Sequence, residues 1–153
     1  SLPKTVIRAL VGRLADTCPD ESLKSTLQDI LDTPVSPELL PPQEDGSIGQ
    51  RTEELLGPYE LHDYFLYYLL RYHFRPSKLF YYACTAFSGV YEPSFIKEKL
   101  LLFLRRLSAG QFKRSAAPDS ARLWEGTFSP ADFWMPSDAG LSELSLELDA
   151  IDF

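Results

Sequence analysis

The sequence has few of the residues that build metal centres and disulfide frameworks. Its 153 residues include two cysteines, two histidines and one methionine. Cys18 and Cys84 lie far apart and neither belongs to a CxxC pair, so we expect free thiols in a reducing compartment. With only His62 and His73 besides, the chain lacks the ligand set of a zinc site. These absences predict a cytoplasmic protein without a metal site.

Long apolar runs and a positive charge balance are also missing. No apolar stretch reaches the roughly 20 residues of a membrane span, and no signal peptide opens the sequence. The net charge of -7 argues against a dominant basic face for nucleic acid. We therefore expect neither a membrane nor a nucleic-acid partner.

The basic residues that are present gather in residues 97–122, whereas residues 123–153 contain no lysine or arginine. This basic segment has three possible roles. It could receive an anionic ligand, pair with the acidic tail, or form a solvated helix face.

Sustained strand alternation is absent, and helical periodicity takes its place. Apolar residues recur at three- and four-residue spacing in residues 3–16, 20–32, 59–74, 76–87 and 93–108. The sequence therefore predicts an all-α protein of 44% hydrophobic composition, large enough for one domain over residues 1–153.

The position of apolar residues within these helices predicts their burial. Helix 3–16 has one apolar face, and helix 20–32 is amphipathic with an inner side formed by Leu23, Leu27, Ile30 and Leu31. Helix 59–74 is apolar on two sides and should be nearly central, its tyrosines favouring core and subunit packing over base stacking. Alternating leucines in residues 141–149 permit a final short helix but leave that assignment ambiguous.

Two segments interrupt the helices. Prolines and glycines recur through residues 33–58, and a loop of this length inside a compact domain is often functional, which makes it a candidate lid. Residues 115–153 form a tail whose first part, 115–140, has little periodicity and should wrap over the helices as irregular chain. The expected architecture is an irregular multi-helix bundle with a long Pro/Gly-rich loop and an irregular C-terminal wrap.

Several motifs stand in a fixed order along the chain. Gln-Phe-Lys-Arg at 111–114 puts two adjacent cations after a long apolar helix, where they can complement the helix dipole or hold a phosphate or carboxylate. Upstream lie Asp-Thr-Pro-Val-Ser-Pro-Glu at 32–38 and Gly-Pro-Tyr-Glu-Leu-His-Asp at 57–63. With Pro-Lys-Thr at 3–5 and Met-Pro-Ser-Asp-Ala at 135–139, these motifs resemble the C-terminal part of bacterial glutamine-dependent NAD synthetase over nearly the whole chain.

The resemblance implies a ligase that amidates deamido-NAD to NAD. In that family ATP adenylates the nicotinate carboxylate, and ammonia released from glutamine displaces AMP. The resemblance further implies a C-terminal fragment of an α/β ATP-pyrophosphatase-type synthetase domain, with deamido-NAD, ATP, magnesium and glutamine as partners of a homo-oligomeric full-length enzyme.

Three site residues follow from this resemblance. Lys113 matches the lysine that contacts deamido-NAD in the family, with Arg114 beside it, and Ser36 matches a hydroxyl that contacts ATP. The alternatives are helix capping and tail pairing for the two cations, and ordinary turn chemistry for Ser36 before Pro37. Asp32 stands where small synthetases often carry a lysine, so a lysine–phosphate contact from this loop is not carried over.

The family's catalytic parts are absent from the sequence. It contains neither the Ser-Gly-Gly phosphate loop nor a glutaminase domain with its nucleophilic cysteine. We therefore expect no catalytic residue, no bound cofactor and no activity in the chain alone. Glu53, Glu54 and Asp63 could bind magnesium, but a solvated acidic face is favoured.

A departure from the family pattern lies at residues 129–134, where both arginines of the usual motif are missing. Their roles are not carried over. The alternative function, from another class, is a non-catalytic helical interaction or regulatory module, which the aromatic helix 59–74 and the acidic tail support.

Overall fold

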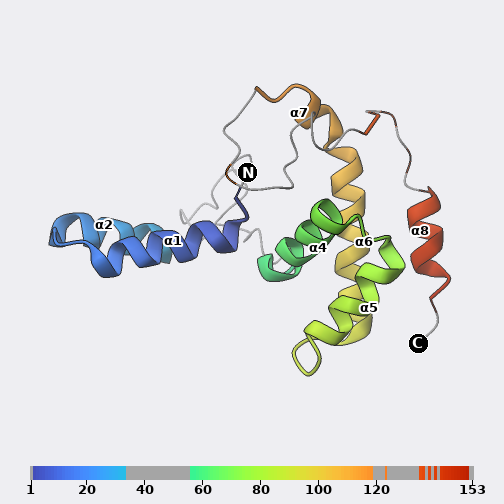
Figure 1. The fold of residues 1–153 in the computed structure, drawn as a ribbon, viewed down its shortest axis with the longest axis horizontal. Coiled ribbons are helices and arrows are strands. Elements are labelled where there is room, and N and C mark those ends of the chain that lie inside the picture. The colour runs from blue at the N-terminus through green and yellow to red at the C-terminus, as the bar shows by residue number, and fades with distance from the viewer. Residues whose placement is uncertain are drawn as a thin grey trace, which may run out of the picture. The chain divides into compact units, whose positions relative to one another are not determined.

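The computed structural model describes residues 2–33, 56–118, 123, 135, 136, 138, 140 and 142–151. Their helices are α1 (Lys4–Thr17), α2 (Glu21–Asp32), α4 (Tyr59–Tyr72), α5 (Pro76–Ala86), α6 (Pro93–Ala109), α7 (Gln111–Ser115) and α8 (Ser142–Asp149) (Figure 1). No strand occurs in these ranges, so the predicted all-α class is confirmed for the described part of the chain. Most of the candidate lid and of residues 115–140 lies outside the described residues.

The chain divides into two compact units, Leu2–Tyr59 and Glu60–Phe153. A prediction of one domain over the whole chain stays a prediction. In the first unit α1 and α2 pack as a helical hairpin. Asp20 caps α2 by accepting hydrogen bonds from the amides of Ser22 at 2.9 Å and Leu23 at 3.2 Å. The Arg8 guanidinium ties the hairpin by donating to the Leu31 carbonyl at 2.8 Å.

The apolar faces of this hairpin are more exposed than the sequence predicts. We call this set the hairpin stripe, and each member is at least 43% exposed: Val6, Ile7, Leu10, Leu14, Leu23 and Ile30. Leu23 and Ile30, expected on the inner side of helix 20–32, are exposed in the described structure, whereas Leu27 and Leu31 are half-buried. Two helices can cover apolar surface only along their shared seam, and Ala15 is the buried hydrophobic residue there among the residues described.

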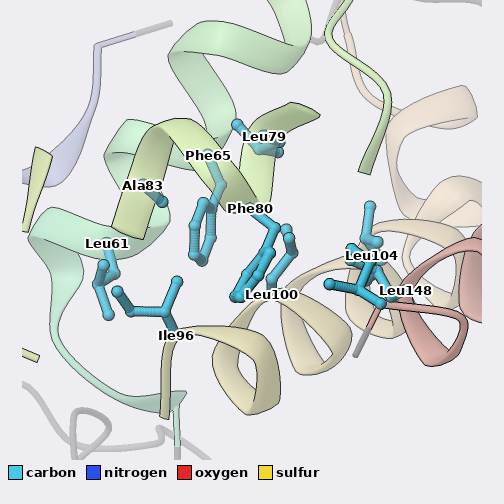
Figure 2. Packing of buried hydrophobic residues seen from close by; sticks show 10 residues of the cluster. Leu61, Phe65, Leu79, Phe80, Ala83, Ile96, Leu100, Leu104 and Leu148 are labelled. Carbon is cyan, nitrogen blue, oxygen red and sulfur yellow. The ribbon is translucent and has the colours of Figure 1, made fainter. Parts of the chain in front are cut away.

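The second unit contains the main core, drawn from α4, α5, α6 and α8 (Figure 2). Its largest fully buried side chains are Phe65, Phe80, Leu61, Leu79, Ile96, Leu100 and Leu148. Burying each of these stabilises the fold by about 1.5–3 kcal/mol relative to exposure. Pro76 and Pro93 open α5 and α6 at first-turn positions, where proline's missing amide leaves no helix bond unmade.

Helix α4 contributes buried side chains to the core of the second unit, and its nearly central position stays a prediction. Leu61 and Phe65 are fully buried, and Tyr64 and Tyr68 pack half-buried against the core with ring centres 4.5 Å apart. Burial, together with Tyr68, raises the pKa of Tyr64 to about 12. That phenol therefore stays neutral at physiological pH, which is consistent with a packing role.

Helix α8 resolves the ambiguity of the alternating leucines. A strand would place Leu144, Leu146 and Leu148 on one face, whereas a helix separates the middle residue from the other two. Leu148 is fully buried and Leu144 packs against the core, but Leu146 is 68% exposed. Helical geometry explains this division. Lys97 of α6 holds the chain just after α8 by donating to the Ile151 carbonyl at 3.0 Å.

Candidate functional site

The predicted ligand-binding motif lies at the corner where α6 meets α7. Helix α6 ends at Ala109, and Gly110 caps it by donating its amide to the Arg106 carbonyl at 2.9 Å. After Gly110 the chain continues directly into the five-residue helix α7. The sequence predicts the end of α6 at Gly110 correctly but does not predict α7, since five residues are too few to show a period.

Lys113 is exposed on α7. Its ammonium lies 5.9 Å from the centre of the Phe112 ring, and Phe112 is itself 61% exposed. An exposed lysine beside an exposed aromatic ring can meet a negatively charged, partly aromatic ligand.

Arg114 has a different environment from its neighbour. Its guanidinium is half-buried and donates from Nε to Gln111 Oε1 at 3.1 Å and from Nη2 to the same oxygen at 2.7 Å. Nη2 also donates to the Leu107 carbonyl, one of the last carbonyls of α6. Burial lowers the pKa of Arg114, but an arginine remains protonated in proteins. The side chain therefore caps the C-terminal end of α6 with a positive charge.

Gln111 is the buried polar partner of this arginine. Its side chain is 3% exposed, Oε1 accepts both hydrogen bonds from Arg114, and Nε2 donates to Ser115 Oγ at 3.3 Å. Gly110 fits closely against the same group, because a Cβ there would lie 3.0 Å from the Arg106 carbonyl oxygen and 3.2 Å from Arg114 Nη1. We name Gly110, Gln111 and Arg114 the α7 clamp.

The two cations therefore have different surroundings. Arg114 is tied to α6 and to Gln111, whereas Lys113 lies exposed beside Phe112. The structure shows the capping alternative for Arg114. Direct ligand contact by Lys113 or Arg114 stays a prediction. Ser36, the predicted ATP contact, lies outside the described residues.

Two acids in the described part of the tail, Glu143 and Glu147, pair with Arg75. Arg75, just before α5, donates to Glu147 at 3.1 Å and to Glu143 at 3.0 Å. The sequence did not predict the contacts of Arg75 with the tail, nor those of Gln111 and Gly110 with Arg114. No sequence pattern marks Arg75 as a partner of the tail, because its partners lie 68 and 72 residues away.

A cavity of about 280 Å³ opens beside the tail contact. Its described lining is mostly apolar and comes from α4, α5, α6 and α8, with Arg75, His73, Ser108 and Glu143 as polar members. Lys113 is not among the described lining residues.

The described residues contain no group of three histidine, cysteine, aspartate or glutamate side chains that could hold a metal ion. Asp63 lies half-buried on α4, whereas Glu53 and Glu54 fall outside the described ranges. None of the described helices combines the length and the apolar character needed to cross a membrane.

Comparison with known proteins connects the chain to one group of enzymes. No protein-family model matches it. The chain is 35% identical, over 157 aligned positions, to the glutamine-dependent NAD(+) synthetase of Mycobacterium leprae, and equally identical to those of Mycobacterium bovis and Mycobacterium tuberculosis.

The match covers 90% of this chain but 23% of each mycobacterial protein, so the chain spans under a quarter of the length of these curated relatives. The resemblance predicted from the motifs is therefore confirmed, as similarity to a partial region of glutamine-dependent NAD(+) synthetases.

Proposed function

We propose that this chain is part of a glutamine-dependent NAD synthetase, a cytoplasmic, homo-oligomeric ligase that amidates deamido-NAD to NAD. The observation that carries the proposal is the 35% identity to such synthetases across 90% of the chain. In the proposed reaction ATP with magnesium activates the nicotinate carboxylate as an adenylate. Ammonia derived from glutamine then attacks, because a free carboxylate is a poor electrophile toward an amine.

Within this enzyme Lys113 contacts deamido-NAD. Its exposure on α7 leaves the ammonium accessible, and a lysine serves as a mobile point charge toward a phosphate or carboxylate. Ser36 contributes a hydroxyl to ATP, which adds a donor without another charge. The hydrogen bonds of Arg114 to Leu107 and Gln111 favour a structural role for this residue over a second direct contact with deamido-NAD.

The test compares Lys113→Ala with Arg105→Ala in the full-length enzyme. Arg105 is a matched control, because it is an exposed cation of the same basic segment. Losing one charge-assisted hydrogen bond should raise the KM for deamido-NAD roughly ten- to hundredfold in Lys113→Ala. The control should stay near the parent value. Equal KM values in all three proteins would refute the contact.

The chain alone is proposed to be inactive, since its sequence contains no Ser-Gly-Gly phosphate loop. Incubation with deamido-NAD, ATP, magnesium and ammonia should form no more NAD than a protein-free control. Turnover above that control would overturn the proposal of a fragment without its own catalytic machinery.

A second candidate function, a non-catalytic interaction module, is favoured by the hairpin stripe. Its exposed apolar side chains are typical of surfaces that meet another protein. An activity assay of the full-length protein separates the two candidates, because a non-catalytic module predicts no NAD formation from deamido-NAD, ATP and glutamine.

A further inference from the structure

We infer that Gln111 and Arg114 are positioning residues that fix the direction in which Lys113 leaves α7. The inference rests on the proposed function, in which Lys113 contacts deamido-NAD. In this role the α7 clamp increases the affinity for deamido-NAD without contacting the substrate itself.

Helix α7 is too short to hold its own conformation. A helix of five residues is far too short to be stable by itself, because the nucleation of a single turn is unfavourable. Its existence and orientation therefore depend on side chains that tie it to larger elements. The Leu107 carbonyl belongs to α6, a 17-residue helix with Leu100 and Leu104 in the core, so α6 is the rigid element available.

The Arg114 side chain connects α7 to α6. Arg114 reaches back seven residues to the Leu107 carbonyl and, with the same planar guanidinium, donates twice to Gln111 Oε1. Its fork thereby joins the first turn of α7 to the last turn of α6. A lysine has no planar fork and cannot reproduce this double contact.

Gln111 is held in one conformation by its burial and its two partners. Its amide is almost completely buried, and both polar atoms have partners, Arg114 at the oxygen and Ser115 at the nitrogen. A buried amide left without partners is unfavourable, so Gln111 favours the single conformation that satisfies both ends. The clamp consequently holds residues on both sides of Lys113, at 111 and at 114.

The consequence for Lys113 is a fixed starting direction. When α7 can turn or unwind, Lys113 points at the substrate for only part of the time, and apparent affinity falls by that fraction. Loosening the clamp should therefore weaken deamido-NAD binding although neither Gln111 nor Arg114 loses a contact with the substrate.

The experiment measures the Kd of deamido-NAD by calorimetry in the full-length enzyme. Gln111→Leu removes the acceptor without altering charge, and Arg114→Lys keeps the charge but removes the fork. Each should raise Kd roughly three- to tenfold, the range expected from a neutral hydrogen bond. Gln111→Glu, which keeps the acceptor oxygen for Arg114, should raise Kd less than Gln111→Leu.

A double-mutant cycle separates positioning from a general structural effect. In a Lys113→Ala background, Gln111→Leu and Arg114→Lys should no longer change Kd, because there is no ammonium to position. A loss of fold would instead lower affinity in both backgrounds. Amide hydrogen exchange over residues 111–116 should accelerate in both clamp variants, a readout that needs no activity.

The outcomes distinguish the two proposals. If Lys113→Ala weakens binding and Gln111→Leu does not, the positioning inference is overturned while the proposed function stands. If clamp variants weaken binding equally with and without Lys113, the inference is likewise overturned. If Lys113→Ala leaves Kd unchanged, the proposed substrate contact itself fails, and the inference fails with it.

Discussion

Glu147 accepts a hydrogen bond of 3.0 Å from the backbone amide of Ser77, across 70 residues of sequence. Ser77 lies in the first turn of α5, whose N-cap Arg75 makes no side-chain cap of its own. The Ser77 hydroxyl also donates to the same carboxylate. A carboxylate at a helix N-terminus satisfies an orphan amide and complements the helix dipole, so α8 supplies the cap that α5 lacks.

Replacing Glu147 by alanine should lower the free energy of unfolding by about 1–2 kcal/mol, the effect of losing a helix cap. Glu143→Ala is the matched control, since Glu143 also pairs with Arg75 but its side chain is 82% exposed, against 17% for Glu147. An exposed pair contributes about 0–1 kcal/mol. Urea unfolding followed by circular dichroism measures both variants. Equal losses would contradict the trans-capping interpretation.

The same carboxylate should make this contact pH-dependent. Burial of Glu147 opposes ionisation, but the hydrogen bonds from Ser77 and Arg75 outweigh that effect and lower the pKa of Glu147. The unfolded chain therefore binds the proton more readily. The stabilisation is fully present above the unfolded pKa of about 4.3 and is lost as pH falls through the folded value.

The stability difference between the parent protein and Glu147→Ala should accordingly be constant above neutrality and shrink below about pH 4. Unfolding free energies measured across this range test the sign. A difference that widens on acidification would show that Glu147 is not stabilised as a carboxylate.

Leu148→Ala and Leu146→Ala test the helical register of α8. Removing a fully buried leucine side chain should lower stability by about 2–5 kcal/mol. The exposed Leu146 should change stability by less than about 0.5 kcal/mol. Thermal or urea unfolding distinguishes the two. Comparable losses would favour a strand-like arrangement in which both leucines share one face.

Glycine-to-alanine substitutions at two positions should act in opposite directions. Gly12 lies inside α1, and an added Cβ would meet Leu31 Cδ1 at an ordinary 3.9 Å. Alanine there should stabilise the hairpin by about 0.5–1 kcal/mol through helix propensity. At Gly110 the Cβ would press on the Arg106 carbonyl and on Arg114, so alanine should destabilise by about 1–3 kcal/mol.

Amide exchange in α1 and in residues 111–116 reads out the two sites separately. Slower exchange in α1 of Gly12→Ala and faster exchange at the clamp of Gly110→Ala are expected. Unchanged amide exchange in residues 111–116 of Gly110→Ala would show that the backbone between α6 and α7 accommodates the added Cβ without loss of structure.

The sequence predicts the longer helices well because their apolar periods extend over several turns. Pro76 and Pro93 mark the starts of α5 and α6, and Gly110 marks the end of α6. Helix α7 is different, since side-chain hydrogen bonds rather than an apolar period hold it. The different surroundings of Lys113 and Arg114 follow from that unpredicted helix.

The exposure of the hairpin stripe was not predictable from periodicity for a related reason. A period identifies which side of a helix is apolar, as at Leu10 and Ile30, but it does not say how much surface the neighbouring helix can cover.

The hairpin stripe has a consequence for the order in which the chain acquires structure. Helices α1 and α2 are joined by a short turn with an Asp20 cap, so their contacts are local and can form early. Early formation does not bring persistence, because a hairpin with so little buried surface gains little free energy by closing. The hairpin is therefore expected to be weakly protected however early it forms, and slow amide exchange in α1 and α2 would report that the stripe has been covered.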